Sequence, residues 1–317
     1  MRAAVVSTRG QAPKYQSFPD PEPQNGEALV QMRAAGLHPV VKAIASGAHY
    51  ASGAGDTPTI PGIDGVGVLA DGRRVFVIFV RKPWGTMAEV AAAPVAKLIP
   101  LPDGLDDATA AAIANPGMSA WLTLKNRAAL AAGETVLIMG ATGVAGQLAI
   151  QVARRLGARR IIAAGRNVDA LKGADVDAVI GLGQPEDAIR HALGAEVARG
   201  IDVVVDYLWG RPTELVLEAL AKGFRAEATH KTRLVEVGES AGKTITLPGA
   251  TLRSIDLTLM GSGFGAAPLG SVLAAIPALF EMAAKGDLTI AVEPVPLSQV
   301  EDAWNRVEKG RRIVFIP

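Results

Sequence analysis

The chain has 317 residues, 49% of them hydrophobic, and its 32 Lys and Arg residues nearly balance its 31 Asp and Glu residues. This length allows two domains with a large core, and the balance of charge argues against binding to nucleic acid or to a membrane surface. The chain contains no cysteine, which excludes disulfides and thiolate metal sites. Its first ten residues, MRAAVVSTRG, hold no apolar segment as long as a signal peptide, so we expect a soluble cytoplasmic protein.

The residues up to about 120 predict short strands, because apolar stretches alternate there with Gly and Pro. The Asp71-Gly72 pair between two apolar runs indicates a hairpin. We therefore expect a mostly antiparallel, barrel-like β domain in this half.

From about residue 121 onward, six short apolar runs alternate with helical patterns. Runs without polar alternation indicate strands covered on both faces, and hence a parallel sheet flanked by helices. Six such strands match a doubly wound dinucleotide-binding fold of the α/β class. The runs are 135–139, 161–164, 178–180, 203–205, 234–237 and 257–260.

The pattern of apolar residues changes again towards the C-terminus. The uncharged run 257–280 contains several Gly and Pro residues, which predicts a strand, a loop and a buried helix rather than a membrane span. The tail after it returns to strand, helix and strand, and we expect it to rejoin the first domain. The predicted domains are therefore residues 1–120 with 264–317, and residues 121–263.

The segment TVLIMGATGVAGQ, residues 135–147, is the strongest candidate for a binding site. Gly140, Gly143 and Gly146 separate a predicted strand from a predicted helix that has apolar residues every fourth position. The N–H groups and the positive dipole end at the start of such a helix can bind a pyrophosphate. The alternative is a tight strand-to-helix turn with no ligand. The expected cofactor contacts are the loop residues Gly140, Ala141, Thr142, Gly143, Val144 and Ala145.

The end of the second strand in this domain indicates which dinucleotide binds. NAD sites carry an acidic residue about 20 residues after the glycine loop, where it bonds the ribose 2′-hydroxyl. Here the strand ends in Gly165-Arg166-Asn167, and no Asp or Glu occurs between Glu134 and Asp169. A guanidinium at this place attracts a 2′-phosphate, so the sequence favours NADPH, unless Arg166 is only a surface charge. Asn167 is expected to cap a helix that has Asp169 in its first turn.

Further cofactor contacts are expected at the carboxyl ends of the later strands, where such folds bind ligands. Tyr207 and Trp209 follow the fourth strand, and they could line the nicotinamide pocket or only cover the sheet. Gly238 and Ser262 follow the fifth and sixth strands and are expected to contact the cofactor through their backbone.

With these residues in place, the chain resembles a zinc-independent medium-chain dehydrogenase/reductase of the quinone oxidoreductase group. The segment GETVLIMGATGVAGQLAIQVARRLGA is similar to the cofactor loop and helix of that family, and AAGLHPVVKAIASGAHY resembles its AAGLNPVD…SG.Y segment. IPGIDGVG, NPGMSAWLTL and the final RIVFIP resemble three further family segments. The resemblance implies a GroES-like catalytic domain, a Rossmann domain, and a homodimer that pairs the strand near 257–260 with its copy.

The chain departs from the zinc alcohol dehydrogenases of this superfamily, which carry a Cys where His38 stands and a His where Ile63 stands. His38 and Asp64 could ligate a metal but Ile63 cannot, so a three-ligand catalytic zinc is not expected. Asp64 lies between glycines, and we expect it to cap a tight turn. The chain also has Val41 where the quinone reductases often carry Asp.

Without zinc, the acceptor must be electrophilic by itself or be polarised by hydrogen bonds. Quinones and α,β-unsaturated carbonyls meet this need, so we expect an NADPH-dependent reductase of a small electrophilic substrate. Tyr50 matches the tyrosine after the SG pair of the family and could donate to the substrate oxygen. His38 takes the place of the family's Asn, and Ser119 could bond the nicotinamide amide. The alternatives are a half-buried structural tyrosine, a packing histidine and a helix-capping serine.

Two other functions fit the same resemblance. One is a zinc-free alcohol dehydrogenase of the same fold, and the other is a non-enzymatic NADPH-binding protein. The sequence does not identify the physiological substrate.

Overall fold

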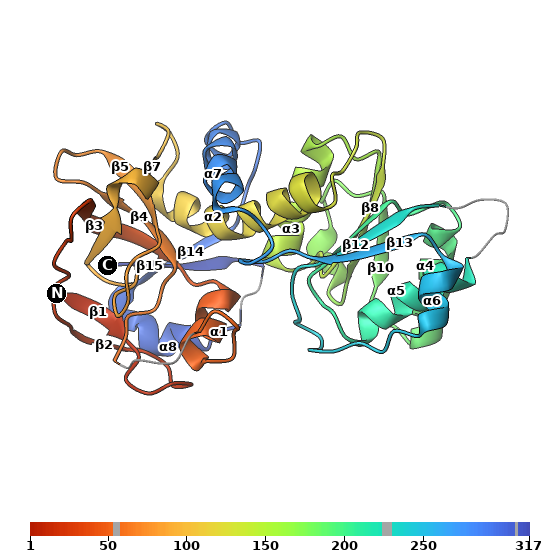
Figure 1. Cartoon of the computed structure of the whole chain (residues 1–317), viewed down its shortest axis with the longest axis horizontal. Helices are drawn as coiled ribbons and strands as arrows, with labels where there is room; N and C mark the ends of the chain where they lie inside the picture. Colours follow the sequence, from red (N-terminus) through yellow and green to blue (C-terminus); the bar gives the residue numbers. More distant parts are fainter. Residues whose placement is uncertain (53–57, 224–229, 308–309) are drawn as a thin grey trace. The chain divides into compact units, whose positions relative to one another are not determined.

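A computed structural model describes residues 1–52, 58–223, 230–307 and 310–317 (Figure 1). The chain forms two compact units, residues 1–115 with 273–317 and residues 116–272. The two domains expected from the sequence, residues 1–120 with 264–317 and residues 121–263, stay a prediction. In the part of the chain that the structure describes, no helix is long and apolar enough to cross a membrane.

The first unit is built mainly on antiparallel strands. Its seven-stranded sheet has the order β14-β15-β3-β4-β5-β7, with β6 paired to β3, and β1 and β2 form a separate pair. Among the described strand pairs of this unit, only β14 and β15 run parallel. The strands are β1 (Arg2–Val5), β2 (Lys14–Ser17), β3 (Glu27–Gly36), β4 (Asp64–Val68), β5 (Arg74–Ile78), β6 (Val90–Pro94), β7 (Ile99–Pro100), β14 (Val292–Pro296) and β15 (Arg312–Ile316).

The predicted Asp71-Gly72 hairpin joins β4 to β5, which pair antiparallel. Gly72 has φ +86, the left-handed conformation that such a turn needs and that glycine adopts readily. The helices of this unit are α1 (Pro39–Ser46) and α8 (Val300–Trp304), together with the larger parts of α2 (Asp107–Trp121) and α7 (Leu269–Ala284).

The second unit contains the predicted doubly wound sheet. Its six strands are all parallel in the order β10-β9-β8-β11-β12-β13, which is 3-2-1-4-5-6 in chain order. The predicted α/β class, a Rossmann sheet with a second, mostly antiparallel domain, is thereby confirmed. The strands are β8 (Thr135–Met139), β9 (Arg160–Gly165), β10 (Ala178–Gly181), β11 (Val203–Asp206), β12 (Thr232–Glu236) and β13 (Leu257–Gly261).

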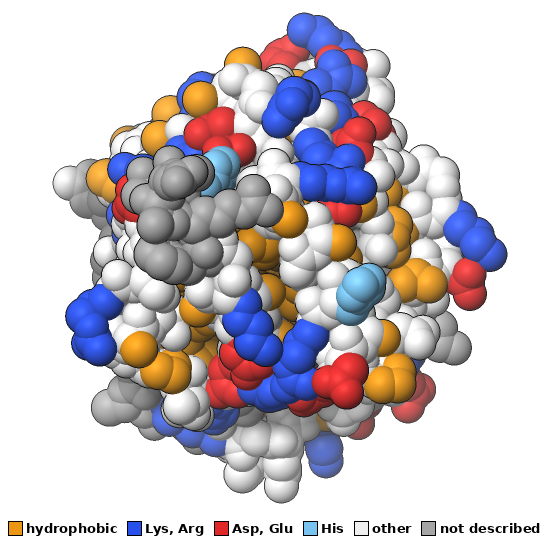
Figure 2. All heavy atoms as spheres, turned by 90° about the vertical axis from the view of Figure 1, so that its right-hand side faces the viewer, with side chains coloured by type: hydrophobic (Ala, Val, Ile, Leu, Met, Phe, Trp, Pro, Cys, Tyr) orange, Lys and Arg blue, Asp and Glu red, His pale blue; other side chains and the backbone are white. Residues whose placement is uncertain are grey.

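The helices of the second unit follow the expected pattern of one buried face. In α3, Val144, Leu148 and Val152 are buried at helical spacing. The two arginines in its last turn lie at the negative end of the helix dipole, which stabilises positive charge. Lys and Arg side chains lie beside Asp and Glu on the face seen in Figure 2, so no single sign of charge dominates it. The α-helices are α3 (Val144–Arg155), α4 (Glu186–Val197), α5 (Arg211–Lys222) and α6 (Gly249–Ser254), and a π-helical segment, Leu122–Arg127, continues α2.

Candidate cofactor and active site

The glycine loop joins β8 to α3, and each of its three glycines meets a different requirement. Gly140 has φ +83, which glycine adopts without steric cost. Gly143 is the N-cap residue of α3. A Cβ on Gly146 would lie 2.4 Å from the carbonyl oxygen of Gly140 and 2.6 Å from Cα of Ala141, so only glycine lets α3 pack this close to the loop. The tight turn at Gly140 and the close packing at Gly146 are two of the requirements of a dinucleotide-binding loop.

The loop is anchored to the sheet and leaves backbone donors free at the start of α3. The N–H groups of Gly140 and Ala141 donate to the carbonyl of Ala164 in β9, at 2.9 and 3.0 Å. Among the described residues, none accepts a hydrogen bond from the N–H of Thr142 or Val144. Free N–H groups at a helix N-terminus suit a phosphate oxygen.

The end of β9 lies against this loop. Gly165 is buried, and the next residue, Arg166, is exposed. Within the described parts of the chain, Arg166 forms no ion pair, so its guanidinium is available to an anion. The helix expected after it is a single 3₁₀ turn, residues 168–171, and Asn167 at its N-cap makes no side-chain capping bond. Asn167 therefore stands at the predicted N-cap position but does not make the bond of a cap. Asp169 lies in the first turn, as predicted, and pairs with Lys172 at 2.8 Å.

A tight turn that carries Tyr207 and Trp209 follows β11. Asp206 is fully buried, and its Oδ1 accepts hydrogen bonds from the N–H groups of Leu208 and Trp209 at 2.9 and 3.1 Å. Its Oδ2 accepts from the Thr213 hydroxyl at 2.5 Å. Burial raises the pKa of Asp206, and these three hydrogen bonds oppose that rise. Trp209 has φ +55, a strained value for a bulky residue, and the Asp206 carboxylate therefore holds the turn in shape.

This turn brings two of the predicted cofactor residues together. A Cβ on Gly140 would lie 3.3 Å from Cβ of Tyr207 and 3.1 Å from Cδ2 of Leu208, so the turn packs directly against the glycine loop. The hydroxyl of Tyr207 is buried, which raises the pKa of Tyr207, while the Ser119 side chain beside it opposes the rise. Ser119 lies inside α2, so it does not cap that helix.

Gly238 and Ser262 lie where the sequence predicts them, just after β12 and β13. The N–H of Gly238 donates to the carbonyl of Asp206 at 3.2 Å, and the N–H of Ser262 donates to the carbonyl of Glu236 at 2.7 Å. The Ser262 hydroxyl is bonded to the Thr123 hydroxyl at 2.9 Å, so both the backbone and the side chain of Ser262 have partners within the protein. Burial, followed by the charges of Asp206 and Glu239, raises the pKa of Glu236.

In the first unit, His38 pairs with Asp64 rather than facing solvent. Nε2 of His38 lies 3.2 Å from Oδ1 of Asp64, and the two side chains are 0% and 3% exposed. The turn predicted around Asp64 is wrong: Asp64 is the first residue of β4, and its carbonyl accepts a hydrogen bond from the Thr86 hydroxyl at 2.6 Å. The His38 side chain is completely buried, so in this structure it has no exposed surface that a substrate could contact.

Tyr50 has the opposite environment. Its side chain is 73% exposed, which contradicts the alternative of a half-buried structural tyrosine. The ring stacks on His49 with centroids 4.1 Å apart. Nζ of Lys82 donates to the carbonyl of Ser52 at 2.9 Å and fastens the segment that carries Tyr50. Of the three candidate catalytic side chains, Tyr50 and His38 belong to the first unit and Ser119 belongs to the second.

Sequence reasoning missed the roles of Asp206 and Asp64. Asp206 could have been found from the sequence, because an acidic residue directly after three valines of a buried strand needs hydrogen-bond donors. The pairing of Asp64 with His38 leaves no local signal, because the two residues come from different segments. In the described residues, no three His, Cys, Asp or Glu side chains come together as a metal-binding group.

Three known proteins show what this chain is similar to. It is 27% identical over 100% of both chains to "Probable NADPH-dependent quinone reductase" from Emericella nidulans. It is 29% identical to the quinone oxidoreductase of Sus scrofa over 74% of each chain. The solved structure of the quinone oxidoreductase from Thermus thermophilus, described with its NADPH complex, has 28% identity, a TM-score of 0.79 and 100% coverage of both chains. No family model matches the chain.

A doubly wound sheet with a dinucleotide-binding loop, joined to a mostly antiparallel β unit, defines a medium-chain dehydrogenase/reductase. In sequence and in fold the chain is similar to the quinone oxidoreductase-like group of that superfamily.

Proposed function

We propose that this chain is an NADPH-dependent reductase that transfers a hydride to a quinone or an α,β-unsaturated carbonyl without a metal. The observation that carries this proposal is the end of β9, where an exposed Arg166 follows Gly165 beside the glycine loop and no carboxylate is present. A ribose 2′-phosphate suits a guanidinium, whereas a ribose diol needs an acceptor that this strand end lacks. The names of the relatives, quinone oxidoreductase and NADPH-dependent quinone reductase, support the same activity.

The residues of the second unit fit the parts of NADPH. The free N–H groups of the glycine loop and the start of α3 would hold the pyrophosphate, and Arg166 would hold the 2′-phosphate. The turn of Tyr207 and the backbone of Gly238 and Ser262, at the carboxyl ends of β11, β12 and β13, would line the nicotinamide half. When bound, NADPH supplies the hydride.

The rest of the chemistry requires the protein to stabilise negative charge on the substrate oxygen. A quinone or enone accepts a hydride at a conjugated position, and the charge then moves to its oxygen. The exposed phenol of Tyr50 is the candidate to donate a hydrogen bond or a proton to this oxygen. The Ser119 hydroxyl, held beside Tyr207, is the candidate to orient the carboxamide of the nicotinamide.

A turnover screen tests the proposal. NADPH oxidation is followed with a benzoquinone, a conjugated enal and a conjugated enone, and NADP⁺ reduction is followed with a simple secondary alcohol. We expect turnover with a conjugated acceptor and little with the alcohol. Faster turnover of the alcohol would favour the alcohol dehydrogenase alternative. Tight NADPH binding with no turnover of any acceptor would favour a non-enzymatic binding protein. The turnover of the conjugated acceptors by Tyr50→Phe is compared with that by Tyr15→Phe, a matched change on β2.

A further inference from the structure

The last residue of β9 is a glycine for a steric reason. A Cβ added to Gly165 would lie 2.4 Å from Cγ2, 2.9 Å from Oγ1 and 3.2 Å from Cβ of Thr142. Carbon atoms in proteins pack at about 3.5–4.0 Å, so the Thr142 side chain already occupies the space of any side chain at position 165. Gly165 does not have the left-handed backbone conformation seen at Gly140, so conformation does not require glycine here.

The backbone on both sides of this contact is tied down. On the loop side, Gly140 and Ala141 donate to the carbonyl of Ala164, and Gly143 donates to the carbonyl of Gly140. On the strand side, the carbonyl of Gly165 accepts from the N–H of Leu182 at 2.9 Å. A new side chain at position 165 therefore has to displace the Thr142 side chain or disturb these bonds.

Position 165 is also where chemistry would place the residue that selects the cofactor. It ends the second strand of the sheet about 20 residues after the glycine loop, which is the place of the ribose-binding acid in NAD sites. Because Thr142 fills the space there, the side chain at the strand end that can meet the adenosine ribose is the exposed Arg166.

Resting on the proposed function, the structure assigns to Thr142 a role as a specificity-determining residue. Its side chain excludes a carboxylate from the end of β9 and so leaves the recognition of the ribose to Arg166. Cofactor choice is then set by two residues of different elements: a steric one in the glycine loop and an electrostatic one after β9.

The steric part is tested in the protein without cofactor. Gly165→Ala adds only the Cβ and should lower the melting temperature by at least about 2 °C. In the Thr142→Gly background, the same substitution should cost less than half of that shift. Thr142→Val is the matched control, because it keeps the shape of threonine without the hydroxyl, and the full cost of Gly165→Ala should persist in it. An equal cost in all three backgrounds would overturn the steric assignment.

The specificity part is tested by titrating NADPH and NADH into the wild type, Gly165→Asp, Thr142→Gly and the double variant. Gly165→Asp alone should weaken NADPH at least about tenfold and bind NADH no more tightly than the wild type. The double variant should bind NADH at least about fivefold more tightly than Thr142→Gly. The inference fails if Gly165→Asp alone gains NADH affinity, or if the double variant gains none. A wild type with no preference for NADPH would instead contradict the proposed cofactor, since the role of Thr142 is read from the double variant.

Discussion

Nε2 of His38 lies 3.2 Å from Oδ1 of Asp64, and both side chains are almost completely buried. These polar groups come from the N-cap of α1 and the start of β4, where zinc-binding members of the superfamily have a metal ligand at position 38 and another at position 63. In this chain an imidazole and a carboxylate face each other, and the neighbouring Ile63 offers no ligand atom. The contact does not have the geometry of a hydrogen bond, so both imidazole nitrogens of His38 and Oδ1 of Asp64 are buried without a hydrogen-bond partner among the described residues.

Removing one member of this pair should destabilise the first unit. Asp64→Ala removes the buried carboxylate that faces the imidazole of His38 and leaves that imidazole without a polar neighbour from Asp64, and we expect a loss of about 1–3 kcal/mol in the free energy of unfolding. Asp64→Asn keeps a side-chain acceptor and should cost less. Urea unfolding at pH 7 measures both, with Asp103→Ala as the control, because Asp103 is exposed. If Asp64→Ala costs no more than Asp103→Ala, the pair has no stabilising role.

Activity should survive removal of metal ions. Four-coordinate zinc sites use Cys, His and carboxylate ligands, and this chain has no Cys and has Ile63 where a His would be needed. We therefore expect full NADPH oxidation after prolonged treatment with a strong chelator and buffer exchange. The metal content of the purified protein is measured by mass spectrometry in parallel. Stoichiometric zinc, together with activity that disappears on chelation and returns with zinc, would contradict the prediction of a metal-independent reaction.

Arg166 should discriminate between the two nicotinamide cofactors. A charge-assisted hydrogen bond contributes about 1.5–3 kcal/mol, and the exposure of Arg166 reduces this, so we expect about a tenfold or greater preference for NADPH over NADH. Arg166→Ala should weaken NADPH binding and leave NADH binding nearly unchanged. Arg33→Ala removes the same charge from an exposed position on β3 and serves as the control. Equal weakening of both cofactors by Arg166→Ala would show that Arg166 does not contact the 2′-phosphate.

The sequence predicts best what depends on short stretches of chain. The six strands of the parallel sheet, the glycine loop and the Arg166 strand end are each readable within a few residues, because apolar runs and helix initiation are local properties. The sequence did not show that the two edge strands, β10 and β13, are half exposed, because that depends on the strand order. The contact of Thr142 with Gly165 and the pairing of His38 with Asp64 join distant segments, so their existence depends on the sheet register and the tertiary packing. For the same reason, the sequence could place Ser119 in a family motif but could not place it beside Tyr207.

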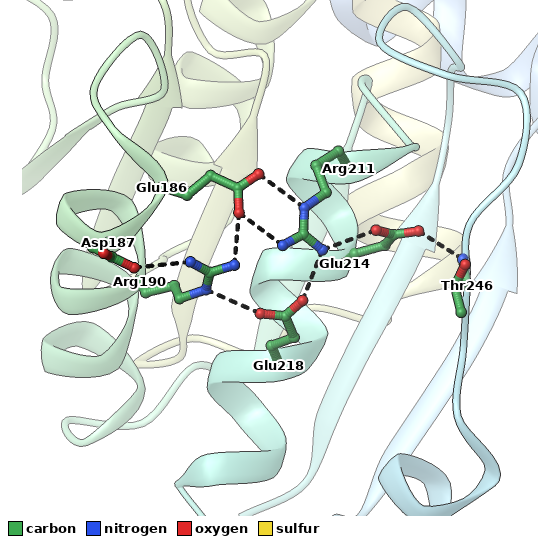
Figure 3. A network of polar contacts seen from close by, with 7 residues as sticks. All are labelled: Glu186, Asp187, Arg190, Arg211, Glu214, Glu218 and Thr246. Carbon is green, nitrogen blue, oxygen red and sulfur yellow. Dashed lines mark hydrogen bonds and ion pairs between the residues drawn. The ribbon is translucent and has the colours of Figure 1, made fainter.

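An ionic network on α4 and α5 should make the stability of the second unit depend on acid pH (Figure 3). Arg211 bonds Glu186 through two nitrogens, at 3.0 and 2.8 Å, and Arg190 bonds the same carboxylate at 2.6 Å. The hydrogen bonds from Arg211, followed by the charges of both arginines, lower the pKa of Glu186 from 4.5 to about 2. Because the folded state has the lower pKa, this stabilisation is complete above about pH 4.5 and is lost as the pH falls through about 2.

The measurement is the melting temperature of the wild type and of Glu186→Gln at pH 7 and at pH 2.5. Glu186→Gln should lower the melting temperature at pH 7 and narrow the difference between the two pH values. Glu301→Gln, an exposed change on α8, should do neither. Because the network is exposed, 1 M NaCl should weaken the effect of Glu186→Gln. An identical pH dependence of the wild type and Glu186→Gln would mean that the network contributes nothing to stability.

The edge of the second sheet should join two copies of the chain. β13 is the terminal strand on the side of β12, and Leu259 in its centre is 38% exposed. An open edge with an apolar side chain favours pairing with another strand, and the pairing of β13 with its copy across a twofold axis would continue the sheet.

We predict a homodimer at micromolar concentration, measured as the mass in solution by light scattering. Leu259→Lys should shift the protein to the monomer, because lysine at an edge opposes strand pairing. Val179→Lys is the matched control, since it makes the same change at an exposed position of β10, the opposite edge of the same sheet, and should leave the mass unchanged. A monomeric wild type would contradict the predicted dimer. A dimer that Val179→Lys disrupts and Leu259→Lys does not would show that the subunits pair through another surface than β13.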